Sequence, residues 1–314
     1  METGIIFGQM LVLLVMMVIG YYVYKKEWID KKAAKQLSGL VVNVFNPVLV
    51  LNGVIGQNAG GSGEKLMLNL GLVFLYFAVL ILFSFLMPVL LRTEKKLKTT
   101  VRLMTVFANV GFMGIPVVQS IYGEEAIIYV AFYILVYNLL LYTYGIRMAE
   151  KSALEYRGVE ASGSWKENLK RMWNPGVIAA LLAVVVFAAD LSVPGPVETF
   201  CGYMGNATVP LSMILIGISL AQEDLKKIFA DIRIYLFILL RMIALPAVMA
   251  LLLKPLIPDP VILGVFVLEI GMPVGSVAAM LIQEKGGDDQ YCTKGIVMST
   301  LCSILTIPII SIFL

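Results

Sequence analysis

The stretch VLEIGMPVGSVAAM, residues 267–280, places an acid, Glu269, inside an otherwise uncharged apolar run. Helix-breaking residues follow the acid at Gly271, Pro273 and Gly275. Proline removes a hydrogen-bond donor and clashes with the preceding helical turn, which frees backbone carbonyl groups. Within a membrane, such groups must be buried in protein or line a wet cavity. The stretch therefore predicts an interrupted membrane helix whose freed backbone groups are buried in protein or face a wet cavity.

The composition of the whole chain is that of a membrane protein. Hydrophobic residues make up 60% of the 314 residues and charged residues only 14%, whereas about a quarter of the residues of a soluble domain are charged. Crossing the hydrocarbon core takes about 20 apolar residues, and the sequence predicts an all-α polytopic protein with ten transmembrane helices. The predicted spans cover about 4–24, 37–56, 66–91, 99–121, 125–147, 175–190, 203–221, 229–253, 260–282 and 291–313.

The composition also excludes several classes of function. The chain has no histidine, and its three cysteines lack the spacing of metal ligands, so zinc sites and histidine-based catalysis have neither ligands nor bases. We find no nucleotide-binding motif that would support primary transport, and no basic patch with interleaved aromatic residues that would bind nucleic acid. We therefore expect a protein of the lipid bilayer that is not an enzyme, has no resident cofactor and binds no nucleic acid.

The distribution of basic residues predicts how the chain is oriented. Nearly all lysines and arginines fall in alternate loops, whereas the loops between them hold only Lys65 and Lys254. Cytoplasmic loops carry the excess of positive charge in membrane proteins, so both termini are expected to lie outside. One basic residue, Arg241, falls within a predicted span.

Short motifs recur in the two halves of the chain. NVFNP at 43–47 matches NATVP at 206–210, and GIP at 114–116 matches GMP at 271–273. Because each half has an odd number of predicted spans, a duplicated half must insert upside down, which is the pattern of inverted repeats in transporters. The predicted domains are a first five-helix repeat over 1–148, a cytoplasmic linker over 149–174 and a second five-helix repeat over 175–314.

The fourth predicted span has an interruption signal that corresponds to the one in the ninth. Its sequence NVGFMGIPVV, residues 109–118, contains Gly111, Gly114 and Pro116. If the two unwound segments cross, four half-helix ends meet at one point. Two of these ends are N-termini, whose free N–H groups and partial positive charge attract an anion without any lysine. The pair of signals thus predicts crossed broken helices 4 and 9 around an anion site.

Several stretches resemble the auxin efflux carrier family, which includes bacterial organic-anion permeases. They are ANVGFMGIPVVQSIYGEEAI in span four, RMIALP in span eight, and MPVGSVAAMLIQEKGG with GIVMSTLCSILTIPI in spans nine and ten. The resemblance implies a scaffold of spans 1, 2, 6 and 7 and a transport domain of spans 3–5 and 8–10 built around the crossing. It also implies a homodimer and an elevator-like movement.

The resemblance also implies roles for individual residues. Asn109 matches the asparagine that opens the family crossover, Pro116 and Pro273 match its prolines, and Tyr137 matches a tyrosine lining the substrate pocket. Val50 replaces a serine of the plant carriers, and their long cytoplasmic loop is missing. These differences favour a small-anion permease of a prokaryotic plasma membrane over a carrier of indole-sized auxin.

Glu269 and Arg241 have several interpretations. The plant carriers have glutamine where this chain has Glu269, while LEIGMP is similar to a sodium-binding element of the bile acid sodium symporters. Acids at membrane depth usually face the protein interior or water. Glu269 is therefore a candidate ligand of Na⁺, a carrier of a coupling proton, an ion-pair partner of Arg241, or a direct substrate contact. Arg241 could instead hold a substrate carboxylate, but pairing between helices is the favoured role.

Polar residues near the interruptions complete the candidate site. Asn109 and Asn138 offer amide donors suited to a carboxylate, although such residues also form hydrogen bonds between helices. Ser276 could cap the outgoing half-helix or touch the ligand. The leading hypothesis is a secondary transporter of small organic anions. A membrane-embedded ligand sensor and a sodium/proton antiporter of similar build are the alternatives.

Overall fold

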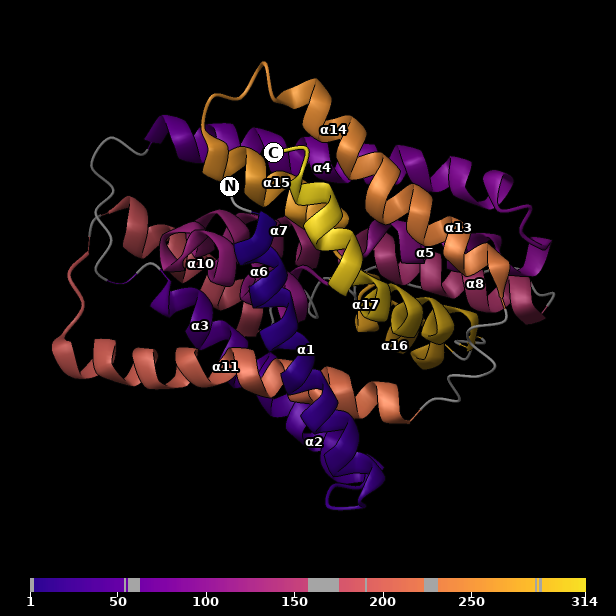
Figure 1. The fold of residues 1–314 in the computed structure, drawn as a ribbon, viewed down its shortest axis with the longest axis horizontal. Helices are drawn as coiled ribbons and strands as arrows, with labels where there is room; N and C mark the ends of the chain where they lie inside the picture. The colour runs from indigo at the N-terminus through magenta and orange to yellow at the C-terminus, as the bar shows by residue number, and fades with distance from the viewer. Residues whose placement is uncertain are drawn as a thin grey trace.

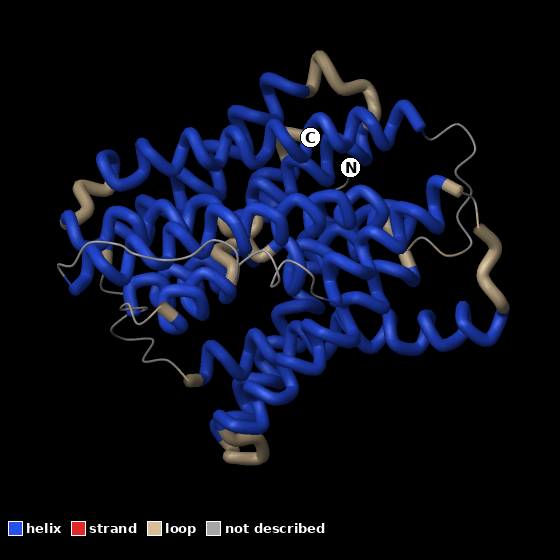
Figure 2. The backbone as a smooth tube through the Cα atoms, turned by 180° about the vertical axis from the view of Figure 1, so that it is seen from behind, coloured by secondary structure: helices blue, strands red, loops and turns tan. Residues whose placement is uncertain are grey.

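The structure, a computed structural model, is helical throughout the part of the chain that it describes (Figures 1 and 2). It describes residues 3–53, 55, 63–157, 175–189, 191–222, 231–285, 287 and 290–314. The α-helices are α1 (Thr3–Lys25), α2 (Lys31–Leu40), α3 (Asn46–Asn52), α4 (Gly63–Leu90), α5 (Lys98–Val106), α6 (Ile115–Tyr122), α7 (Ile127–Leu140), α8 (Ile146–Arg157), α10 (Pro175–Ala188), α11 (Gly195–Ala221), α13 (Ile232–Ile238), α14 (Leu245–Leu253), α15 (Pro260–Gly271), α16 (Ser276–Glu284) and α17 (Gln290–Ser311).

Several helices have the length and apolar character of membrane spans. Among the described residues, six continuous helical stretches are long and apolar enough to cross a membrane, and three shorter apolar helices accompany them. Helices occupy each of the ten ranges that the sequence predicts as spans. At the predicted linker, the helix continues to Arg157, and residues 158–174 lie outside the described part. The prediction of an all-α polytopic membrane protein is therefore supported.

Three π-helical segments precede prolines inside these long helices. Val41–Phe45, Val110–Gly114 and Leu239–Ala244 each end two residues before a proline. A proline has no N–H for the carbonyl four residues earlier, and its ring clashes with that carbonyl. Widening the preceding turn is one way to keep the helix continuous, and such widened turns are frequent at functional sites. The helix therefore continues through the proline.

The helices α1 and α11 form the most extensive packed pair (Figure 1). Gly20 of α1 faces the backbone of Ile214, and Gly217 of α11 faces the carbonyl oxygen of Met17. Small residues allow membrane helices to approach at backbone distance. In the view of Figure 1, α11 runs along one edge of the helical body, and α13 and α14 run along the opposite edge.

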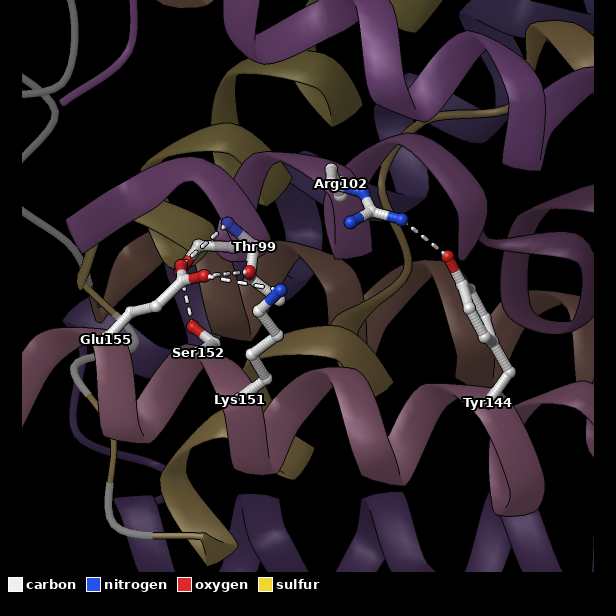
Figure 3. A network of polar contacts seen from close by, with 7 residues as sticks. Thr99, Arg102, Tyr144, Lys151, Ser152 and Glu155 are labelled. Carbon is white, nitrogen blue, oxygen red and sulfur yellow. Dashed lines mark hydrogen bonds and ion pairs between the residues drawn. The ribbon is translucent and has the colours of Figure 1, made fainter. Parts of the chain in front are cut away.

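A polar network fixes the start of α5, the helix that leads into the first interruption (Figure 3). The Glu155 carboxylate of α8 accepts hydrogen bonds from the backbone N–H of Thr99 at 3.2 Å and from its hydroxyl at 2.7 Å. Further along, the Arg102 guanidinium donates to the Tyr144 hydroxyl at 3.0 Å. The first N–H groups of a helix have no partner within the helix, so Glu155 supplies one from another element.

Candidate functional site

The fourth and ninth predicted spans are both interrupted, and the two interruptions lie against each other. Between α5 and the following helical segment, Phe107 and Asn109 leave helical geometry. Between α15 and α16, Met272 is extended, as expected for a residue that precedes a proline. Ala108 and Val274 pair as an isolated antiparallel bridge. The predicted meeting of the two interruptions is confirmed.

Two backbone hydrogen bonds hold this crossing together. The N–H of Asn109 donates to the carbonyl of Pro273 at 2.8 Å, and the N–H of Gly275 donates to the carbonyl of Phe107 at 2.9 Å. A Cβ atom on Gly275 would lie 2.9 Å from the Ala108 carbonyl oxygen. Glycine is therefore required at position 275, because two backbones approach each other there. Groups freed by the interruptions satisfy each other, as burial in a membrane demands.

The structure corrects the predicted position of the first interruption. Pro116 lies in the first turn of α6 and is buried, and Gly114 ends the π-helical segment before it. The chain leaves the helix earlier, at Phe107, without a proline. The helix begins at the Asn109 cap, and the widened π-helical turn at Val110–Gly114 accommodates the missing N–H of Pro116. The proline thus follows the break instead of causing it.

A cavity of about 170 Å³ lies at the crossing. Two of its walls are the starts of the outgoing half-helices, at Asn109–Phe112 and at Gly275–Val277. Tyr137 forms part of another wall and packs edge-to-face on Phe107 with ring centroids 5.6 Å apart. None of the described residues that line it carries a charge. The lining residues are Asn43, Asn46, Pro47, Val50, Ala108, Asn109, Val110, Gly111, Phe112, Ile115, Ile134, Tyr137, Asn138, Leu141, Gly176, Gly275, Ser276 and Val277.

The side chain of Asn109 caps a helix with its oxygen and has a nitrogen available for a ligand. Its carbonyl oxygen accepts the N–H of Phe112 at 3.1 Å and so caps the outgoing half-helix. Its amide nitrogen donates no hydrogen bond within the described ranges. Because Asn109 lines the cavity and is only half-buried, this nitrogen is a donor available to a ligand.

The other asparagines of the wall differ from Asn109. The amide nitrogen of Asn138 donates to the Ile134 carbonyl at 2.8 Å, and that of Asn43 donates to the Gly39 carbonyl at 2.7 Å, each within its own helix. Asn46 makes no side-chain hydrogen bond to the described residues and faces Gly111 across the cavity. The sequence interpretation missed Asn46 because it treated NVFNP only as a repeat signature.

The structure brings together six of the ten predicted substrate-binding residues and leaves four outside the cavity wall. Asn109, Gly111, Tyr137, Asn138, Gly275 and Ser276 line the cavity. Gly114, Pro116, Gly271 and Pro273 do not. Gly271 packs against the side chain of Ile310, and Pro273 contributes its carbonyl to the crossing. These glycines and prolines shape the backbone around the cavity instead of facing it.

Arg241 does not pair with Glu269 in the structure, so the ion-pair interpretation of these two residues is wrong. The Arg241 guanidinium donates to the carbonyl of Thr105 at 2.9 Å and to the carbonyl of Ile270. Thr105 lies in the last turn of α5 and Ile270 in the last turn of α15. Cations are favourable at helix C-termini, where carbonyl groups are left without partners. One arginine therefore binds the ends of both incoming half-helices.

Glu269, one residue before Ile270 in α15, is fully buried. Neither of its carboxylate oxygens has a hydrogen-bond partner among the described residues. A Cβ atom on Gly114 would lie 2.5 Å from one of these oxygens and 2.8 Å from the other, so the carboxylate fills the space that Gly114 leaves open. The Tyr76 hydroxyl is 3.5 Å from the Glu269 backbone carbonyl. A buried acid without a partner is costly, and in a membrane it usually marks an ion or proton pathway.

Comparison with known proteins agrees with this architecture. A family model described as "Membrane transport protein" matches residues 5–311. The chain belongs to this family. This family is the auxin efflux carrier family that the sequence resembles, and the match covers nearly the whole chain.

Its relatives are named as transporters. A protein of Methanothermobacter thermautotrophicus named "Uncharacterized transporter" is 28% identical over 303 residues, which cover 88% of this chain and 97% of that protein. A protein of Rhizobium meliloti named "Putative malonate transporter" is 23% identical over 205 residues, which cover 64% of this chain and 62% of that protein. Transport proteins of this family are typically not enzymes.

Proposed function

We propose that this protein is a secondary transporter of small organic anions that binds a carboxylate in the cavity at the crossing. The observation that carries the proposal is that both outgoing half-helices begin at one cavity whose described wall has no charged side chain. Helix N-termini present free N–H groups and a partial positive charge to an anion. The free amide donor of Asn109 adds a hydrogen bond of the kind that carboxylates accept.

The size and polarity of the cavity favour a short mono- or dicarboxylate. Asn46 and Asn109 place amide groups in a wall that is otherwise mainly apolar and small. A site built from amides and backbone N–H groups recognises a carboxylate by hydrogen bonds and leaves little room for a large ring. The name of the Rhizobium meliloti relative makes malonate a reasonable first substrate.

The mechanism that we propose is alternating access by an elevator-like movement in a homodimer. The two interruptions are joined backbone to backbone, so the crossing can move as one body with its cavity. The tightly packed pair of α1 and α11 would form part of the static scaffold. We further propose a multi-pass protein of a prokaryotic plasma membrane, with both termini outside.

Glu269 is the group that we propose for coupling transport to Na⁺ or to a proton. It is fully buried next to the half-helix that begins at Asn109, and neither oxygen is satisfied within the described residues. Carboxylate oxygens are also the hard ligands that Na⁺ accepts. Gly114 connects this acid to the cavity, because Gly114 ends the segment whose start lines the cavity wall. Binding of Na⁺ or of a proton by Glu269 would therefore act on the segment that forms this cavity wall.

Uptake of radiolabelled malonate into liposomes containing the purified protein tests the proposal. We expect saturable uptake whose KM rises about 10- to 100-fold in Asn109→Ser, because a hydrogen bond to a charged group contributes about 1.5–3 kcal/mol. Serine also caps helices well, so this change removes the amide donor and keeps the cap. Asn43→Ser is the matched control, since the amide nitrogen of Asn43 is bonded to its own helix.

The outcomes separate the proposal from its alternatives. The control variant should keep KM within about twofold of the unmodified protein. Binding of malonate without flux would indicate a sensor, and cation flux without malonate would indicate an antiporter. Either result contradicts the proposed function, as does an unchanged KM in Asn109→Ser.

A further inference from the structure

Arg241 joins two helix ends that are far apart in sequence. It lies in the π-helical segment Leu239–Ala244, and its side chain is only 2% exposed. Its guanidinium donates to α5 at Thr105 and to α15 at Ile270. It does not line the cavity, and it forms no ion pair with any residue that the structure describes. Its charge is therefore balanced by the carbonyl ends of the two half-helices.

The partial negative charge of these two carbonyl ends opposes the binding of an anion at the cavity. The crossing brings together two helix N-termini, each equivalent to roughly half a positive charge, and two C-termini, each equivalent to roughly half a negative charge. Left alone, the four ends would nearly cancel at the cavity. A full positive charge on the C-terminal ends removes this cancellation. The N-terminal ends at Asn109 and Gly275 then dominate the field at the cavity.

We propose that Arg241 is a positioning residue that gives the cavity its affinity for anions without touching the substrate. It acts through the carbonyl ends of α5 and α15, which it holds together and neutralises. This inference rests on the proposed function, because it concerns how the same cavity binds its substrate. A planar group with donors pointing in several directions suits two carbonyls on different helices, whereas lysine is a single point charge.

The charge of the substrate provides a readout that a purely structural role would not change. The interaction of Arg241 with a dianion is twice its interaction with a monoanion at the same place. If removal of the charge raises KM for a monoanion about threefold, it should raise KM for a dianion about tenfold. Malonate and its half-amide, malonamate, are nearly the same size and carry two and one negative charges at about pH 8.

The experiment measures KM for malonate and malonamate with Arg241→Gln and Arg241→Lys in liposomes. We expect the ratio of the malonate KM to the malonamate KM to rise about threefold in Arg241→Gln. In Arg241→Lys the ratio should stay within about twofold of the unmodified protein, because the charge is kept. Arg102→Gln is the matched control. It removes an arginine of α5 that donates to the Tyr144 hydroxyl and stacks on the Phe85 ring, neither of which is a helix end, and it should leave the ratio unchanged.

A second set of variants controls for misfolding caused by the loss of Arg241. Each change is also made with a disulfide between Ala108→Cys and Val274→Cys, which holds the crossing together when the arginine is absent. Equal rises in both KM values, or no rise in either, would overturn the inference. If the unmodified protein transports neither compound, the proposed function fails first, and the two failures are thereby distinguished.

Discussion

At position 275, two backbones lie too close together for a side chain. We predict that Gly275→Ala lowers the free energy of unfolding by about 1–3 kcal/mol, because overpacking at a rigid contact costs this much. The new methyl carbon would meet the carbonyl oxygens of Ala108 at 2.9 Å and Phe107 at 3.1 Å, and backbone atoms cannot move aside. Thermal unfolding in detergent and malonate uptake measure the effect.

Gly71→Ala is the control for this change. Gly71 lies on an exposed face of α4, and nothing lies within 4 Å of a Cβ atom built there. Since alanine forms helix better than glycine by about 1 kcal/mol, this variant should be as stable as the unmodified protein or more so. Equal stability of both variants would mean that the backbones do not meet at position 275.

The buried acid at position 269 makes a prediction about coupling. We expect Glu269→Gln to abolish the dependence of uptake on an imposed Na⁺ or proton gradient, because the amide has nearly the same shape but neither charge nor a titratable proton. Initial uptake rates under each gradient are the measurement. Glu150→Gln is the control, since Glu150 is half-buried and pairs with Lys285 at 2.7 Å. Unchanged gradient dependence in Glu269→Gln would exclude a coupling role for this residue.

The start of α15 depends on one aspartate. Asp259 accepts the N–H groups of Val261 at 3.0 Å and Ile262 at 3.2 Å, and it pairs with Lys65 at 2.7 Å. Burial alone would raise the pKa of Asp259, but the hydrogen bonds from Lys65 and from the two backbone N–H groups outweigh it and lower the pKa below its ordinary 3.8. The folded protein therefore binds this proton less readily than the unfolded chain does.

This lowered pKa predicts the pH dependence of stability. The stabilisation by Asp259 is fully present above about pH 4 and is lost as the pH falls through the folded-state pKa. Asp259→Asn keeps an N-cap but does not titrate. We expect the difference in melting temperature between the two proteins to shrink or reverse between about pH 5 and about pH 3. Parallel melting curves over this range would contradict the assignment.

Among the helical elements, the sequence predicted which would break but not where each break begins. Gly and Pro in spans four and nine identified the pair, and Pro273 does lie in its interruption. Pro116 does not, because the π-helical segment before it lets the helix accommodate the proline. The Asn109 cap, which starts the outgoing half-helix, marks the break more closely than the proline.

The partners of the charged residues could not be predicted from sequence. Arg241 and Glu269 form the obvious pair of opposite charges in apolar spans, yet Arg241 binds backbone carbonyls instead. Every residue has a carbonyl, so no residue type signals such a partner. Asn46 was missed for a similar reason, since its position opposite Gly111 arises only when the helices pack.

The proposed orientation of the molecule in the membrane is inferred from the distribution of its basic residues. We predict that a green fluorescent protein fused after Leu314 stays dark in cells, because we propose that the C-terminus lies outside, and green fluorescent protein that is exported in unfolded form does not mature there. The same fusion within residues 158–174 should fluoresce, because the positive-inside rule predicts that this part of the chain lies in the cytoplasm. The reverse pattern would contradict the proposed orientation.

The most direct test of the central claim is a cross-link between the two interruptions. Ala108 and Val274 face each other as an antiparallel pair flanked by the two crossing hydrogen bonds, and the Cα atoms of such a pair are about 4.5 Å apart, within the range of a disulfide. In a chain whose Cys201, Cys292 and Cys302 are replaced by serine, Ala108→Cys with Val274→Cys should form an internal disulfide under mild oxidation, detected by mass spectrometry of peptides. Neither single variant should do so. Two cysteines that stay free in the folded protein would contradict the crossing and the anion site built on it.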